Sequence, residues 1–179
     1  MRSAYWRALK CLLCWLLIVL PGLAQHHHDP LNQVEIDQLR EATLEPDKRL
    51  KLFITFARER LASMEKDRSD PKVTNRADIT HEWLADFSQL YDELNDNIDM
   101  YVDRKEDLRK ILPTVIEADT EFQSKLHALK DAADVSRKEA AQYEFVLTTA
   151  LENLDSGVES HRELLQKQQE DFKNKKKKK

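Results

Sequence analysis

The stretch from Ile79 to Ala133 constrains the fold of this chain more than any other part of its sequence. Most gaps between its apolar side chains are three or four residues, which is the spacing of one face of an α-helix. An eleven-residue repeat, which gives about 3.67 residues per turn, runs through Ile79, Leu90, Tyr101 and Leu112. We expect one long helical element whose apolar stripe is covered by other helices. The stripe consists of Ile79, Trp83, Phe87, Leu90, Leu94, Ile98, Tyr101, Leu108, Leu112, Val115, Phe122, Leu126 and Leu129.

Pro113 interrupts this stretch and allows two interpretations. A proline inside a helix costs about 3 kcal/mol, because it lacks a backbone N–H and clashes with the preceding turn. The apolar spacing nevertheless keeps its phase from Leu112 to Val115, and no Gly, Asn or Asp of a tight reversal stands beside the proline. We favour a kinked but continuous helix, with a helical hairpin as the alternative.

Prolines delimit the elements that precede the long one. We expect a short helix over 31–44 after Pro30, and a second helix over about 46–65, because Pro46 suits a first helical turn. Residues 66–75 are polar, contain a proline and are expected to form a loop.

A last helix is indicated by a capping box, in which Ser136 is followed three residues later by Glu139. Its apolar face repeats the spacing of the long element, with residues eleven apart at Tyr143, Leu154 and Leu165. The matching repeat predicts that this helix lies antiparallel along the long element.

Glycine is almost absent, since the chain has only Gly22 and Gly157. Turns with positive φ are therefore hard to form, which disfavours β-hairpin folds, phosphate-binding loops and dinucleotide-binding loops. Charged residues make up 35% of the chain and alternate with apolar ones, as in amphipathic helices. These patterns predict an all-α fold: an elongated antiparallel bundle, or coiled-coil-like hairpin, of three to four helices in one domain over residues 31–172.

The N-terminus has the three parts of a secretory signal peptide over residues 1–24. Three basic residues precede an apolar run over 11–20, and small residues at Gly22 and Ala24 suit cleavage after Ala24. An uncleaved anchor is the alternative, although the run is shorter than the roughly 20 residues that span a bilayer. We therefore expect an exported protein, periplasmic or extracellular. Both cysteines, Cys11 and Cys14, would leave with the leader, so the mature chain would contain no disulfide.

Residues 25–30 form a His-rich segment that we expect to be disordered. Cleavage after Ala24 would place His27 third from a free amine. An amine, two backbone amides and an imidazole then form the square-planar donor set that Cu(II) and Ni(II) prefer. The candidate metal residues are Gln25, His26, His27 and His28. A solvated leader without metal is the alternative, and we expect no other cofactor.

The C-terminus carries six lysines among residues 173–179. Such a run repels itself, and we expect a disordered tail. It is either a solvated end or, through Lys175–Lys179, a tether to an anionic envelope surface. Because no aromatic residue or arginine accompanies these five lysines, specific nucleic-acid recognition is not expected.

The run from Asn95 to Glu106 resembles an EF-hand calcium loop in the spacing of its oxygen-bearing side chains. The position that requires glycine is Met100, and the apolar stripe passes straight through the run. We expect the polar face of a continuous helix there, with a calcium site as the alternative.

No catalytic motif occurs, so we expect a non-enzymatic protein with no small-molecule substrate. Our hypothesis is an exported helical protein that acts by protein–protein contact, as an envelope scaffold or adaptor. Trp83, Phe87 and Tyr91 could form an apolar surface for a protein partner or for self-association. The alternatives are a periplasmic holdase-like chaperone and a metal-binding protein that uses the His leader.

Overall fold

The computed structural model describes residues 29–132 and 135–177, and all regular structure within them is helical. The expected all-α fold is therefore confirmed. The expected signal peptide, residues 1–24, lies outside the described residues. No helix of the described part has an apolar stretch long enough to cross a membrane. The helices are α2 (Gln33–Glu41), α3 (Pro46–Ser69), α4 (Arg76–Asp103), α5 (Leu112–Lys130) and α6 (Arg137–Lys177).

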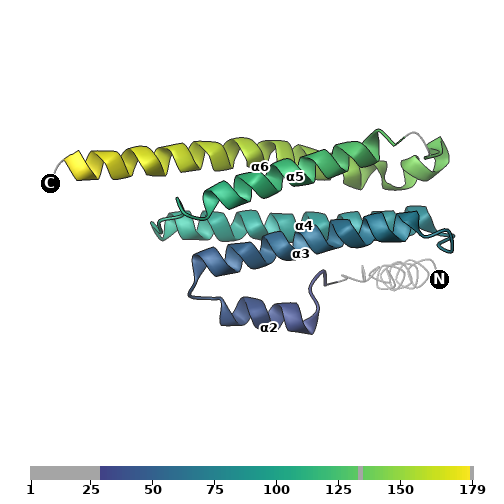
Figure 1. The fold of residues 1–179 in the computed structure, drawn as a ribbon, viewed down its shortest axis with the longest axis horizontal. Coiled ribbons are helices and arrows are strands. Elements are labelled where there is room, and N and C mark those ends of the chain that lie inside the picture. The colour runs from purple at the N-terminus through teal and green to yellow at the C-terminus, as the bar shows by residue number, and fades with distance from the viewer. Residues whose placement is uncertain (1–28, 133–134, 178–179) are drawn as a thin grey trace, which may run out of the picture.

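Four long helices, α3 to α6, lie side by side along the long axis of the molecule (Figure 1). Both α3 and α6 pack against α4 and against α5. Hydrogen bonds between paired positions fix the direction of α3 relative to α4. Arg49 bonds Asn97 near the start of α3, and Arg68 bonds Thr80 near its end, so α3 and α4 are antiparallel.

The last helix is antiparallel to α5 and parallel to α4. Its bonds to α5 join His161 to Asp119 and Asp155 to Gln123, so the two helices run in opposite directions. Near the start of both helices, Thr80 of α4 and Glu139 of α6 share Arg68 as a partner, and further along both helices Asn153 bonds Asp92, so α6 and α4 run in the same direction. The expectation that α6 is antiparallel to the whole stretch from Ile79 is therefore wrong for α4 and correct for α5.

The chain reverses between α4 and α5, so the expected kinked but continuous helix through Pro113 is not formed. The helix ends at Asp103, and Lys105 has a φ of 62°, the left-handed conformation that turns a chain away from a helix. Pro113 then lies in the first turn of α5, where its missing N–H costs no helical hydrogen bond. The apolar phase persists because the connection itself packs into the core, with Leu108 and Ile111 buried.

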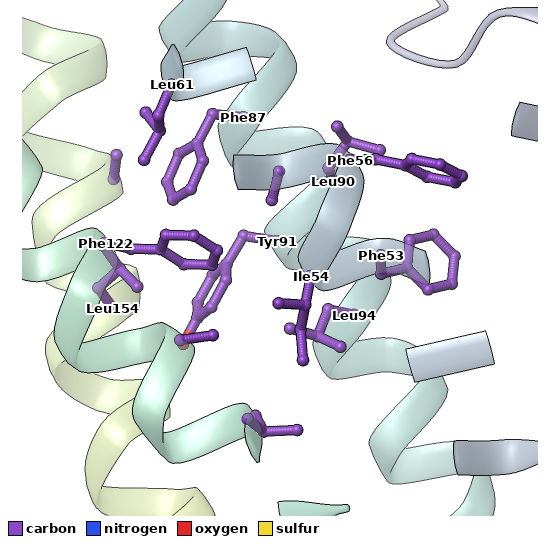
Figure 2. Close-up of a cluster of buried hydrophobic side chains, with 14 of the residues drawn as sticks. Phe53, Ile54, Phe56, Leu61, Phe87, Leu90, Tyr91, Leu94, Phe122 and Leu154 are labelled. Atoms are coloured by element: carbon purple, nitrogen blue, oxygen red, sulfur yellow. The ribbon is translucent and has the colours of Figure 1, made fainter. Parts of the chain in front are cut away.

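The predicted stripe lies in the core together with buried side chains of α3 and α6, and Figure 2 shows the aromatic centre of this core. Eleven of the thirteen stripe residues are buried, whereas Ile79 and Trp83 are half-buried. The ring of Phe87 stacks on Tyr91 at 6.1 Å between centroids and meets Phe122 edge-on at 5.3 Å. The contact of Phe87 with Phe122 joins α4 to α5 across the interior, where the two backbones do not touch.

The short helix α2 is held to α3 by a buried ion pair. A capping box starts the helix, because Asn32 accepts from the backbone of Glu35, whose side chain accepts from Asn32 N. Glu35 also contacts Arg60 at 2.6 Å, and the same guanidinium donates to the carbonyl of Pro30 at 2.6 Å. Pro30, which we expected in a disordered segment, is thus buried against α3.

The structure also differs from our expectation at the C-terminus. Residues 173–177 continue α6 as a helix and do not form a disordered tail. This extension of α6 is favourable because a helix that continues from a packed segment needs no new nucleus. Lysine is also a good helix former, and basic side chains interact favourably with the negative end of the helix dipole. Lys178 and Lys179 lie outside the described residues.

Candidate functional site

Three buried polar side chains from three helices form one hydrogen-bonded network. Asp119 of α5 has no exposed surface; its Oδ1 accepts from the Tyr91 hydroxyl at 3.0 Å. Its Oδ2 lies 2.8 Å from Nδ1 of His161, which is 4% exposed. The carboxylate oxygen accepts from Nδ1–H of the imidazole. The network therefore fixes the orientation of the imidazole.

Gly157 makes room for this network. A Cβ at this position would lie 2.1 Å from the Tyr91 hydroxyl oxygen and 3.1 Å from the adjacent ring carbon. A glycine within a helix costs about 1 kcal/mol relative to alanine. Because Gly157 has no Cβ, the Tyr91 side chain of α4 lies directly against the backbone of α6 at this position.

The buried Tyr91 side chain should make the free energy of unfolding decrease at alkaline pH. Burial, followed by the negative charge of Asp119, raises the pKa of Tyr91 well above its ordinary value of 10.0. Above pH 10 the unfolded chain loses this proton and the folded chain keeps it. The free energy of unfolding should therefore be unaffected below about pH 10 and fall by up to about 1.4 kcal/mol per pH unit above it.

This dependence is checked by urea unfolding at a series of pH values between 8 and 12, with Tyr91→Phe as the control. The variant should show a shallower decline, because the phenol that titrates in the unfolded state is gone. Burial also raises the pKa of Tyr101, so part of the decline should remain in the variant. Equal slopes in the two proteins would contradict the prediction.

A surface groove of about 370 Å³ lies between α4 and α6, directly beside the network. His161 and Gly157 form part of its lining, so the imidazole connects the buried network to the groove. The other polar lining residues carry oxygen or amide groups: Asp92, Asn95, Asp99, Asn153, Ser156 and Ser160.

The groove favours hydrogen-bond donors and positive charge. Its lining contains two carboxylates, Asp92 and Asp99, and neither Lys nor Arg. Oδ1 of Asn95 is buried and accepts no hydrogen bond from the described residues. Burial, and then the nearby charge of Asp96, raises the pKa of the Asp92 carboxyl, while the bond from Asn153 opposes this rise.

A second feature is the basic end of α6, which extends beyond the other three long helices (Figure 1). Gln168 holds it to the α4–α5 connection by accepting from Leu108 N at 2.9 Å and donating to the Glu106 carbonyl at 3.1 Å. One turn further, the Arg109 guanidinium lies 3.7 Å from the ring centroid of Phe172. Beyond this contact, residues 173–177 are exposed, and Lys175 lies on the side of α6 that faces Asp107 and Arg109.

Arg109 has a second partner in the same connection. Its hydrogen bonds to the Asp107 carboxylate lower the pKa of Asp107 to about 2. The Asp107 carboxylate therefore stays charged at moderately acidic pH, and so does its ion pair with Arg109.

The predicted metal residues fall outside these features. Gln25, His26, His27 and His28 lie outside the described residues. The run from Asn95 that resembles a calcium loop is helical as far as Asp103, so its side chains spread around α4 and do not converge as in a loop. Within residues 29–132 and 135–177 no three His, Cys, Asp or Glu side chains are placed to hold a metal ion.

The apolar docking surface that we expected around Trp83 is not formed. Phe87 and Tyr91 are 0% and 1% exposed, because they point into the centre of the four helices and contact Phe122 or Asp119. Trp83 is half-buried, and its indole N–H donates to Asp67 at 2.9 Å. Trp83, Phe87 and Tyr91 lie on adjacent turns of one face of α4. Their spacing does not show how much of this face the other helices cover.

Comparison with family models, curated proteins and solved structures found no match to this chain.

The buried network was not anticipated from the sequence. In the sequence, His161 is a lone histidine beside the apolar face of the last helix, and Asp119 has no distinguishing neighbour. The one available signal was Gly157, a glycine in the middle of a helix that otherwise avoids it, since such a glycine often marks a close approach.

Proposed function

We propose that this chain is an exported, non-enzymatic helical protein that acts by contact, as a scaffold or adaptor at the cell envelope. The observation that carries the proposal is the projecting end of α6. It places Lys173, Lys175, Lys176 and Lys177 on an exposed helix beyond the rest of the molecule. We propose that these lysines attach the protein to anionic lipid headgroups, while the rest of the surface remains free for a protein partner.

The helical state of this segment supports attachment. A rigid helix, clamped to the body through Gln168 and Phe172, presents its lysines together at a fixed distance from the four-helix core. Each lysine near an anionic lipid surface contributes about 1 kcal/mol, so four of them suffice for appreciable binding. The chain has a formal net charge of −4, so this basic end differs in charge from the remainder.

A holdase-like chaperone has less support, because it needs a continuous apolar surface. The large apolar side chains that are exposed in the described residues lie on different segments. They are Val34 on α2, Leu44 in the turn after it, and Phe145 and Phe172 near opposite ends of α6. A contact role that uses charge fits this distribution better.

The lipid contact is tested by co-sedimentation with vesicles of phosphatidylglycerol and phosphatidylcholine. Replacement of Lys173, Lys175, Lys176 and Lys177 with Gln should weaken binding to anionic vesicles by about several hundredfold. Binding of the unaltered protein should also fall steeply with added salt, because exposed charges are screened.

A matched control changes four exposed lysines at the opposite end of the molecule. Lys66, Lys72, Lys130 and Lys138 replaced with Gln alter the net charge by the same amount. This variant should bind anionic vesicles nearly as well as the parent protein. Equal losses in the two variants, or no preference for anionic over neutral vesicles, would contradict the proposal.

Export is tested separately, by expressing the full chain and weighing the product from the exported fraction by mass spectrometry. A mass that corresponds to a chain beginning at Gln25 is the expected result. A product of full-length mass that stays in the cytosol would overturn the exported location without bearing on the lipid contact.

A further inference from the structure

One face of α3 points away from the centre of the four long helices. Arg49, Phe53, Phe56 and Arg60 follow one another at spacings of four, three and four residues, so they share one side of the helix. Figure 2 shows the rings of Phe53 and Phe56 pointing away from the cluster around Tyr91. Both rings are nevertheless buried, so another part of the chain covers this outer face of α3.

The short helix α2 supplies that cover, and it lies at the edge of the molecule beside α3 (Figure 1). At one end, Arg60 of α3 donates to the Pro30 carbonyl and to the Glu35 carboxylate. At the other end, Arg49 donates to the carbonyl of Leu39. The segment from Pro30 to Leu39 therefore lies antiparallel along α3, over the two phenylalanines between these anchors. Leu39 is buried and belongs to the same apolar core cluster as both rings.

The attachment of α2 is limited to α3, the one described helix against which it packs. It has nine residues, fewer than the roughly 12 to 15 that a helix needs to form by itself in water. It is also the first element of the described chain, so no other described element has to move with it. The free energy for releasing α2 should therefore be smaller than the free energy for unfolding the four long helices.

A hinge of Thr43, Leu44 and Glu45 joins α2 and its C-cap to α3. The Leu44 side chain is 92% exposed, although it is strongly apolar. Pro46 prevents the two helices from merging into one, because its ring would clash with the carbonyl four residues earlier in a continuous helix. After its release, α2 therefore remains a separate arm that can reach a neighbouring molecule.

We propose that the outer face of α3 is an interaction surface for a second copy of this chain, which inserts its own α2 there. Complementarity identifies this occupant, because the buried Arg60 needs a carboxylate partner and α2 carries Glu35 at the correct distance from Leu39. In the exchanged pair each copy gives α2 to the other, and the same contacts form as within one copy. The two hinges then lie side by side, which brings together the exposed Leu44 side chains of both copies.

The unaltered chain provides the first test. Hydrogen exchange followed by NMR should show that the amides of α2 exchange at least about a hundredfold faster than those of α4 near Tyr91. Sedimentation equilibrium should detect a dimer as the protein concentration approaches about 1 mM, the effective concentration typical of a short tether. Equal exchange rates in α2 and α4, or a monomer throughout this range, would overturn the proposal.

Two charge reversals identify the surface that the second copy uses. Arg60→Glu places two carboxylates against each other, and Glu35→Arg places two guanidinium groups against each other. Each variant alone should therefore release its α2 and remain monomeric. In an equimolar mixture each α2 meets an opposite charge in the other variant, so a heterodimer should form at least about tenfold more tightly than either homodimer. A mixture that contains only monomers, or variants that self-associate as strongly as they mix, would contradict the exchange.

The control combines Glu35→Arg and Arg60→Glu in one chain, where the reversed charges are matched again. Its α2 amides should exchange more slowly than those of either single variant. If all three variants exchange equally fast, this pair of charges does not hold α2 on α3 and the assigned surface is wrong. Every variant keeps the lysines of α6, so failure of this proposal leaves binding to anionic vesicles unchanged.

Discussion

Gly157→Ala should lower the free energy of unfolding by about 1 to 3 kcal/mol, the usual cost of an added methyl group in a packed interior. At an unconstrained helix position the same change raises stability by about 1 kcal/mol. The sign reverses because the new Cβ would lie 2.1 Å from the Tyr91 hydroxyl oxygen. Tyr91 must then move within a closed core and lose its bond to Asp119. Urea unfolding followed by circular dichroism measures the change.

The cause is isolated by repeating the substitution in a Tyr91→Phe background. Without the hydroxyl the closest remaining contacts are ring carbons at 3.1 and 3.3 Å, which small shifts relieve. Gly157→Ala should then cost much less, so the two changes should be strongly non-additive. If Gly157→Ala stabilises the parent protein, the close packing of Tyr91 against α6 is not maintained in solution.

Asp119→Ala should be the most damaging single substitution in the network, with a loss of about 3 to 5 kcal/mol. Asp119 is completely buried and accepts from two side chains. Its removal leaves the Tyr91 hydroxyl and His161 Nδ1 buried without a partner and opens a cavity between α5 and α6. Because most single domains have only about 5 to 15 kcal/mol of stability, the variant should unfold at a much lower urea concentration.

Two further variants show whether the hydrogen bonds are responsible. Asp119→Asn keeps an acceptor for Tyr91 and a polar group for His161, so it should cost less than the alanine variant. Asp96→Ala removes an exposed carboxylate from α4 and should change stability by no more than about 0.5 kcal/mol. A loss for Asp119→Ala as small as that for Asp96→Ala would mean that the network does not contribute to stability.

Local patterns in the sequence predict the helices and most of the core. Apolar spacing, proline position and caps depend only on near neighbours, so the start of α3 at Pro46 follows directly from them. The end of α4 cannot be predicted from these local patterns. The apolar spacing across residues 104–111 is the same whether the chain is helical or folds back with Leu108 buried, and only contacts with α6 distinguish these two paths.

By itself, the sequence determined an all-α protein with an amphipathic stripe from Ile79 to Leu129, because helical periodicity is a property of a single segment. The tertiary structure decided the reversal before Pro113, the neighbours of α6 and the meeting of Tyr91, Asp119 and His161. These residues are 28 and 42 positions apart along the chain, and their approach depends on how the helices pack. Side-chain spacing within one helix carries no information about which residue of another helix lies opposite, so packing alone creates the network and the groove beside it.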